Sequence, residues 1–110
     1  MVKYVPERGD LVWIDFEPQT GHEQARHRPA LVLSPAEYNA ATGLAILCPV
    51  TSRVKRYPFE VAVVGVRVKG IVLADQVKSV DWGARNARFA ERATGVADKV
   101  AGIVAALISA

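Results

Sequence analysis

Short apolar runs, each about as long as one β-strand, recur along this chain with turn residues between them. We expect strands at residues 10–16, 28–35, 44–51, 58–64 and 70–76, a continuation of the bent sheet at 78–82, and one more short strand at 90–94. Regularly spaced short strands are typical of an all-β barrel or sandwich. The sequence therefore predicts a mainly β fold, specifically a small and strongly bent antiparallel barrel.

Two segments depart from this pattern and are predicted to be helical. Residues 36–41 form a short helix after the second strand, with Ser34 as a plausible N-cap and Pro35 as its first residue. Gly43 ends this helix. The C-terminal segment has one apolar stripe at helical spacing. The stripe consists of Val96, Val100, Ile103, Val104, Leu107 and Ile108. This second helix is expected to lie against either the barrel or a partner subunit.

The length and composition are those of one small globular domain, which we take to span residues 1–110. Hydrophobic residues make up 51% of the chain and charged residues 23%, so the chain can bury one modest core. The lone cysteine, Cys48, lies in an apolar run and is expected to pack as a small hydrophobic side chain. One cysteine allows neither an internal disulfide nor a cysteine-based zinc site.

The charge balance is mildly basic. There are 14 Lys and Arg residues against 11 Asp and Glu residues, which gives a net charge of +3. This excess suits a polyanionic partner such as RNA or DNA, although an ordinary soluble protein can carry the same charge. The N-terminal residues lack the apolar region of a signal peptide, and no apolar run approaches the roughly 18 residues of a membrane span. We expect a cytoplasmic protein with no membrane partner.

Polar and charged side chains gather where the expected strands begin and end. These candidates are His22, Glu23, Arg26, His27 and Arg28 before the second strand, Thr51, Ser52, Arg53, Lys55 and Arg56 after the third, and Asp75, Gln76 and Lys78 after the fifth. In a compact barrel several strand ends can converge on one rim. The candidates therefore include the parts of one functional site.

A carboxylate, an arginine and a hydroxyl at one rim can together cleave RNA without a metal ion. The 2′-OH must lose a proton, the 5′-oxygen must gain one, and the phosphate oxygens need donors or cations for their growing charge. Arginine suits the last task because its planar guanidinium makes two hydrogen bonds and keeps its charge. The chain has no HxxxH or CxxC spacing and no Walker A or GxGxxG motif, so no metal or cofactor is expected.

Each leading candidate also has a purely structural interpretation, and the sequence leaves both open. Arg28 heads an apolar strand, where it can form an ion pair with Asp10 or Asp15 instead of serving a reaction. Thr51 can be an ordinary β-branched residue at a strand end. Glu23 can be a solvated carboxylate in a loop.

The other polar residues and the two tryptophans also have both a structural and a functional interpretation. His22 and His27 fit a two-histidine acid–base model or are simply exposed. The basic side chains after the third strand can be a solvated face or a phosphate-binding track. Asp75 can be a turn cap, Trp13 is expected in the core, and Trp82 fits either the core or a platform for base stacking.

Motifs along nearly the whole chain occur in the order and spacing of a known family. They are YVP at 4–6, GDLVWIDF at 9–16, GHEQ at 21–24, HRPA at 27–30, VLSP at 32–35, CPVTS at 48–52, YPFEV at 57–61 and GIVLADQVKS at 70–79. In these motifs the chain resembles the MazF/PemK family of toxins, the ribonuclease halves of bacterial toxin–antitoxin pairs, and most closely the MazF branch. The least familiar stretch is the Ala-rich segment 83–110.

The resemblance implies an SH3-like barrel, a homodimer, and metal-independent, sequence-specific cleavage of single-stranded mRNA to a 2′,3′-cyclic phosphate. By matching motif positions, Arg28 and Thr51 form the catalytic pair, and Glu23 acts as a base or contacts the substrate. The residues that would contact RNA are His27, Ser52, Arg53, Lys55, Arg56, Asp75, Gln76 and Lys78. The usual partner of the family is an antitoxin whose flexible acidic tail covers the RNA site.

Two other functions remain to be separated from this one. A toxin of the same barrel type can poison DNA gyrase by binding it, and such a protein needs no arginine and threonine facing a phosphate. A basic RNA-binding module whose catalytic site has decayed is the third interpretation. The presence of Arg28 and Thr51 in the matching motifs favours the nuclease.

Overall fold

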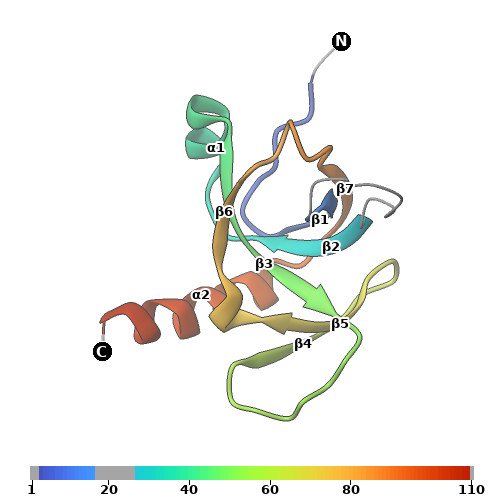
Figure 1. Ribbon diagram of the computed structural model, residues 1–110, viewed down its shortest axis with the longest axis vertical. Helices are drawn as coiled ribbons and strands as arrows, with labels where there is room; N and C mark the ends of the chain where they lie inside the picture. Colours follow the sequence, from blue (N-terminus) through green and yellow to red (C-terminus); the bar gives the residue numbers. More distant parts are fainter. Residues whose placement is uncertain (1–2, 17–26, 110) are drawn as a thin grey trace, which may run out of the picture.

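In the computed structural model, which describes residues 3–16 and 27–109, seven strands form one curled half-barrel sheet and two α-helices pack on it (Figure 1). The strands are β1 (Asp10–Asp15), β2 (His27–Val32), β3 (Leu44–Thr51), β4 (Glu60–Val64), β5 (Lys69–Leu73), β6 (Lys78–Asp81) and β7 (Arg88–Arg92). The helices are α1 (Ala36–Thr42) and α2 (Thr94–Ser109), and a 3-10 helix covers Ala74–Gln76. The predicted mainly β fold, with one short helix after the second strand and one at the C-terminus, is confirmed.

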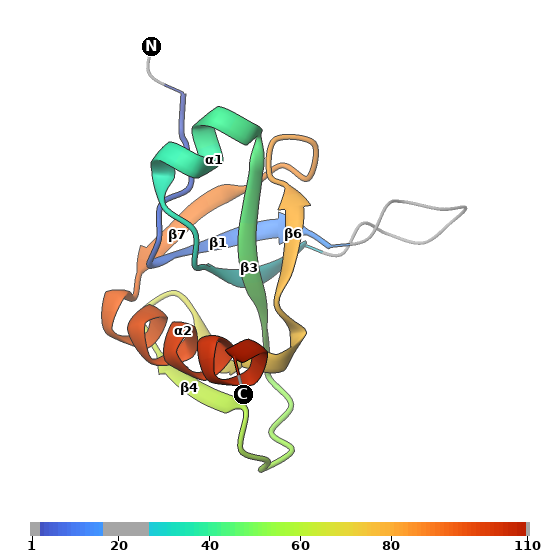
Figure 2. The ribbon, with the colours of Figure 1, turned by 90° about the vertical axis from the view of Figure 1, so that its left-hand side faces the viewer.

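The long strand β3 holds the two halves of the sheet together. The strand order is β4-β5-β3-β2-β1-β7, with β6 also pairing with β3, and every pair is antiparallel. The first half of β3 pairs with β6, its middle with β2, and its last two residues, Val50 and Thr51, with β5. One strand therefore carries the chain from the α1 end of the molecule to the β4–β5 hairpin (Figure 2).

The predicted elements agree with the structure except near their ends. The expected strand 70–76 stops at Leu73, where the chain turns into the 3-10 helix, and the expected strand 90–94 lies at Arg88–Arg92. The predicted N-cap role of Ser34 is wrong, because Pro35 occupies the cap position of α1. The Ser34 hydroxyl instead donates to Asn39 Oδ1 at 2.6 Å and accepts the Ile46 N–H at 2.8 Å.

Two clusters of buried apolar side chains lie on opposite faces of the curled sheet. The larger cluster joins β1, β2 and β3 to the β4–β5 hairpin and to α2, whose Ala97 and Val100 are fully buried. The smaller cluster packs beneath the N-terminal segment and is covered in part by Trp82. Cys48 is buried in the larger cluster, as predicted, and burial raises the pKa of its thiol to about 12.

The apolar stripe of α2 only partly packs against its own barrel. The residues of the stripe from Val96 to Val104 contact the larger cluster, whereas Leu107 is 42% exposed and Ile108 is 80% exposed. Figure 2 shows α2 lying across the front of the molecule, and Figure 1 shows its C-terminal end reaching past the sheet. The end of the stripe therefore remains an apolar surface on this single chain.

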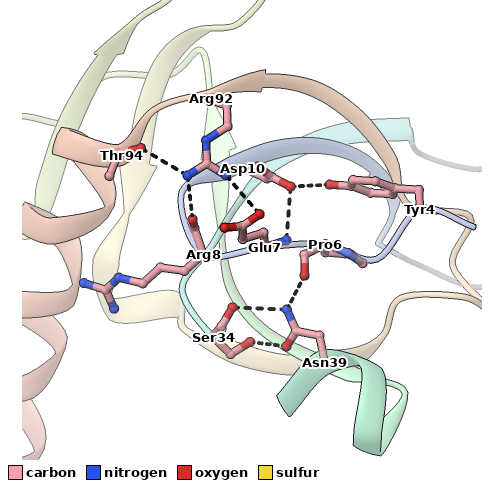
Figure 3. Close-up of polar contacts among 9 residues, drawn as sticks. All are labelled: Tyr4, Pro6, Glu7, Arg8, Asp10, Ser34, Asn39, Arg92 and Thr94. Atoms are coloured by element: carbon pink, nitrogen blue, oxygen red, sulfur yellow. Dashed lines mark hydrogen bonds and ion pairs between the residues drawn. The ribbon is translucent and has the colours of Figure 1, made fainter. Parts of the chain in front are cut away.

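A buried carboxylate ties the N-terminal segment to the last strand (Figure 3). Asp10 is 3% exposed and accepts hydrogen bonds from the Tyr4 hydroxyl at 2.6 Å, the Glu7 N–H at 3.0 Å and Arg92 Nη1 at 2.7 Å. Burial and the bond to Asp10 raise the pKa of the Tyr4 hydroxyl, which therefore remains a donor at neutral pH. Because buried charges are stable only when they are paired and hydrogen-bonded, this cluster should matter for folding.

We expect Asp10→Ala to lower the free energy of unfolding by about 2–4 kcal/mol, because it leaves a buried tyrosine hydroxyl and an arginine without their acceptor. Asp98→Ala is the control: it removes a carboxylate from the exposed Arg8–Asp98 pair and should cost less than about 1 kcal/mol. Urea denaturation followed by tryptophan fluorescence measures both. Equal losses for the two variants would contradict the role given to Asp10.

Strand β5 approaches β3 very closely at Gly70. A Cβ atom added at this glycine would lie 2.6 Å from the Thr51 carbonyl oxygen and 3.1 Å from Val50 Cγ1. The pairing of Thr51 with Ile71 therefore requires a residue without a side chain at position 70.

We predict that Gly70→Ala lowers the free energy of unfolding by roughly 1–3 kcal/mol, since the added methyl group must push β5 away from β3. Gly102→Ala is the matched control, because a Cβ there meets nothing within 4 Å and the change to alanine favours a helix. Thermal or urea unfolding distinguishes them. A Gly70→Ala protein as stable as the Gly102→Ala protein would rule out the close contact.

Candidate active site

One pocket at the ends of three strands collects the leading candidates. It has a volume of about 310 Å³ and is lined by Arg28, Pro29, Val50, Thr51, Ser52, Arg53 and Lys69. These residues come from the start of β2, the end of β3 with the residues that follow it, and the start of β5. The structure thus brings together four predicted site residues from two segments of the chain: Arg28, Thr51, Ser52 and Arg53.

The strand register explains why Arg28 and Thr51 meet. Strand β2 runs antiparallel to β3, with Ala30 opposite Pro49. Continuing that register by two residues places Arg28 opposite Thr51, and directly opposed residues share one face of a sheet. A guanidinium and a hydroxyl that are distant in sequence therefore line the same hollow.

The alternative ion pairs proposed for Arg28 do not occur. Asp10 accepts from Arg92, and Asp15 accepts from His27 Nδ1 at 2.7 Å and from Asn86 Nδ2 at 3.0 Å. The bonds from Asn86 and His27 hold the pKa of the Asp15 carboxyl below its usual value. Both carboxylates are thus engaged elsewhere, and Arg28 lines the pocket.

The Thr51 hydroxyl has a defined place in the turn that follows β3. Its Oγ1 accepts the backbone N–H of Arg53 at 3.1 Å. Because the hydroxyl is the acceptor in this contact, its own proton can be donated to a ligand in the pocket. The same contact turns the chain so that Ser52 and Arg53 also line the pocket.

The remaining predicted residues that the structure describes do not line this pocket. His27 bonds to Asp15 and stacks on Trp13, with 6.4 Å between ring centroids and 8° between ring planes. The backbone N–H groups of Lys55 and Arg56 donate to the Glu60 carboxylate. The other residues outside the pocket lining are Asp75, Gln76 and Lys78.

Two of these outlying residues contact aromatic side chains away from the pocket lining. Asp75 accepts a hydrogen bond from the Tyr57 hydroxyl at 3.0 Å, rather than acting as a simple turn cap. Lys78 Nζ lies 4.8 Å from the centre of the Phe16 ring. The candidates His22, Glu23 and Arg26 lie outside the described residues, so their placement adds nothing to the site.

Reasoning from the sequence missed Lys69, the first residue of β5, as part of the site. Lys69 stands just before the expected strand 70–76, and nothing in its neighbours distinguishes it from an ordinary surface lysine. Trp82 packs against the smaller core cluster and its indole N–H donates to the Asn39 carbonyl at 3.0 Å. This favours the core interpretation of Trp82 over the stacking platform.

The charged residues that line the pocket, among those the structure describes, are all basic. They are Arg28, Arg53 and Lys69. Residues 3–16 and 27–109 contain no group of three or more His, Cys, Asp or Glu side chains placed to hold a metal ion. Within the same part of the chain, no helix is long and apolar enough to cross a membrane. The pocket is therefore suited to a polyanion with hydrogen-bond acceptors.

Comparison with known proteins gives one consistent result. Residues 7–109 match the model of the PemK-like, MazF-like toxins of type II toxin–antitoxin systems. The endoribonuclease toxin MazF of Escherichia coli K12 is 55% identical over 85 residues, which cover 77% of each chain. The endoribonuclease PemK of Escherichia coli is 36% identical over 91 residues, covering 78% of this chain and 68% of PemK.

Solved structures of MazF from Deinococcus radiodurans have the same fold. One crystal form of a MazE–MazF complex matches with a TM-score of 0.90 and 51% identity, covering 97% of this chain and 98% of the other. A structure of MazF alone matches with a TM-score of 0.85 and 52% identity, covering 98% of this chain and all of the other. Because the family model and these relatives span most of its length, the chain belongs to the PemK-like, MazF-like toxins of type II toxin–antitoxin systems.

Proposed function

We propose that the pocket between β2, β3 and β5 is the active site of an endoribonuclease toxin that cuts single-stranded mRNA at specific sequences. The observation that carries the proposal is that Arg28 and Thr51 line one pocket together with two further basic residues, Arg53 and Lys69. Family membership supports the same activity, since the similar MazF and PemK proteins are endoribonucleases. The gyrase-binding alternative has no such support.

The proposed reaction is attack of the ribose 2′-oxygen on the neighbouring phosphorus. The 2′-O–P bond forms, the P–O5′ bond breaks, and the products are a 2′,3′-cyclic phosphate and a free 5′-hydroxyl. Arg28 stabilises the negative charge that grows on the phosphate oxygens, since its fixed guanidinium can make two hydrogen bonds to them. The Thr51 hydroxyl donates a hydrogen bond to a phosphate oxygen and so holds the phosphodiester in place.

The 2′-OH gives up its proton to the base or to solvent, and the leaving 5′-oxygen takes a proton from Arg28 or from solvent, so the step is balanced. Glu23 is the proposed base or substrate contact, and it lies outside the described residues. No metal or cofactor takes part in the proposed steps. The RNA would continue from the pocket over neighbouring polar groups at the strand ends. These proposed contacts are His27, Ser52, Arg53, Lys55, Arg56, Asp75, Gln76 and Lys78.

The wild-type protein should cut a long transcript in the presence of EDTA and leave fragments that end in a cyclic phosphate. Arg28→Ala should reduce the cleavage rate by roughly 10²–10³-fold while leaving the unfolding midpoint unchanged, because the guanidinium stabilises charge that appears only during the reaction. Gel analysis of the fragments measures both the rate and the end group.

Lys99→Ala is the control for lost positive charge, since Lys99 is exposed on α2 and does not line the pocket. It should cut at the wild-type rate. Full activity in Arg28→Ala would remove Arg28 from the mechanism. Uncut RNA together with inhibited DNA gyrase would favour the gyrase-binding alternative over the nuclease.

A homodimer is the proposed assembly, and the exposed end of α2 supports it. An apolar groove of about 550 Å³ lies between α2, the start of α1 and β3. Its lining includes Tyr38, Ile46, Val104 and Ile108, and Ile108 is 80% exposed on the single chain. Contiguous apolar surface of this kind on a small protein usually marks an interface.

We expect Ile108→Glu to shift the protein from dimer to monomer, because a carboxylate at this position would be desolvated in the interface. Ala106→Glu adds the same charge to an exposed position of α2 that does not line the groove, and it should leave the dimer intact. Light scattering after size-exclusion chromatography gives the mass of each. A wild-type monomer, or a dimer that tolerates Ile108→Glu, would contradict this interface.

The proposed protein partner is an antitoxin with a flexible acidic tail. The similar Deinococcus radiodurans MazF is found in complex with MazE, which supports a partner of this kind. The basic lining residues Arg28, Arg53 and Lys69 suit the pocket to receive acidic side chains in place of RNA phosphates. The same family membership supports an SH3-like barrel type and a cytoplasmic location, which are parts of the proposal.

A further inference from the structure

The start of β5 forms one side of the pocket and contributes Lys69, a residue that the proposed reaction has not used. Lys69 lines the pocket with Arg28, Thr51 and Arg53. The three cations come from three different segments of the chain: β2, the residues after β3, and β5. Because an RNA chain brings a phosphate with every nucleotide, three cations around one hollow exceed what a single scissile phosphate requires.

The turn before Lys69 is held by a carboxylate that reaches across from β7. Glu91 accepts the backbone N–H groups of Val66 at 3.1 Å, Arg67 at 2.5 Å and Val68 at 2.8 Å. The turn is closed by a bond from the Gly65 N–H to the Val68 carbonyl at 2.8 Å. Three consecutive backbone donors on one carboxylate fix the turn through charge-assisted hydrogen bonds.

We call the Glu91 carboxylate, bound to the backbone of the turn 65–68, the anchor. Features of both the turn and the strand β7 accommodate this anchor. A Cβ atom at Gly65 would lie 2.5 Å from Glu91 Oε1, so a side chain at position 65 would displace the carboxylate from its present position. The β1–β7 register shifts between Leu11 and Val12, where Glu91 and Phe89 are the successive partners. Such an irregularity re-aims a side chain, here toward the β4–β5 turn.

The anchor is charged under ordinary conditions. The backbone N–H groups of Arg67 and Val68 hold the pKa of the Glu91 carboxyl below its usual value. Glu91 therefore remains ionised at neutral pH and keeps its full strength as an acceptor.

The residues on either side of Lys69 also fix its backbone position. Val68, just before it, is only 2% exposed and is part of the larger core cluster. Gly70, just after it, lies against the Thr51 carbonyl, and the next residue, Ile71, pairs with Thr51, so β5 is joined closely to β3 beside Lys69. The lysine is thus a flexible side chain on a backbone position that is fixed from both directions.

We propose that Lys69 is a further RNA-binding residue of this site, that it contacts a phosphate next to the scissile one, and that Glu91 is the positioning residue that aims it by holding the turn 65–68. The inference rests on the proposed nuclease function for its substrate. Lys69 contributes to binding, and Arg28 contributes to the chemical step. Loss of Lys69 should therefore act mainly on KM and on the salt dependence of binding, and much less on kcat.

Salt-dependent binding to an uncleavable ligand tests Lys69 directly. The probe is a fluorescein-labelled pool of random-sequence 2′-O-methyl oligoribonucleotides, which carry phosphates but lack the attacking hydroxyl. Each lost phosphate contact on single-stranded RNA lowers the slope of log Kd against log salt concentration by about 0.7. Lys69→Ala should show this loss, Lys69→Arg should keep the wild-type slope, and Lys99→Ala should match the wild type.

Glu91→Gln tests the positioning role with a change that keeps the shape of the side chain and removes its charge. It should lower the salt slope as Lys69→Ala does, and the double variant should show no further loss, because both changes remove the same contact. A purely structural role for Glu91 would lower the unfolding midpoint and leave the slope unchanged. All variants are compared at a temperature where circular dichroism shows them folded.

The outcomes separate this inference from the nuclease proposal. A Lys69→Ala protein with the slope and KM of Lys99→Ala would overturn the role of Lys69, even if RNA is cut and Arg28→Ala is inactive. A wild-type protein that gives the expected slopes but cuts no RNA would overturn the nuclease and still support the Lys69 contact. Additive losses in Lys69→Ala with Glu91→Gln would overturn the link between the two residues.

Discussion

The structure depends on the pairing of one strand, β3, with three others. Its hydrogen bonds to β6, β2 and β5 join the α1 end of the molecule to the β4–β5 hairpin. Because the middle of β3 is committed to β2, its last residues leave the main sheet beside the first residues of β2 and turn toward β5. The pocket lies where β3 turns from β2 toward β5, and its lining includes residues of all three strands and of the turn after β3.

Each wall of the pocket is set by a different kind of interaction. The register of β2 on β3, which ends at the Ala30–Pro49 pair, leaves Arg28 and Thr51 two residues further along and in the lining of one pocket. The hydroxyl of Thr51 holds the turn that brings Arg53 into the lining. The β5 wall is held by Glu91 from one side and by the close contact of Gly70 with Thr51 from the other. A preorganised set of cations of this kind stabilises phosphate charge without rearranging during the reaction.

The strands were predictable because each is a short apolar run bounded by turn residues. The exact residues at which strands and helices end were less predictable, because a local pattern does not show which residues will pair. Strand β5 ends at Leu73, before the end of the expected strand 70–76. The next residue, Ala74, is apolar, but it begins a 3-10 helix and is buried in the core rather than paired in the sheet. Ser34 fits the composition of a helix cap, but its hydroxyl is used by Asn39 and Ile46. In both cases a contact with a residue elsewhere in the fold, rather than the local sequence pattern, determined the structure.

The sequence by itself determined the mainly β fold, the two helices, the family, and the residue types that carry the proposed chemistry, because these depend on periodicity and on motifs read along the chain. Only the tertiary structure decided which candidates share a pocket. It separated Arg28, Thr51, Ser52 and Arg53 from the other predicted RNA contacts and added Lys69. The physical reason is that antiparallel register joins residues far apart in sequence, and register is set by pairing across the whole sheet rather than by local neighbours.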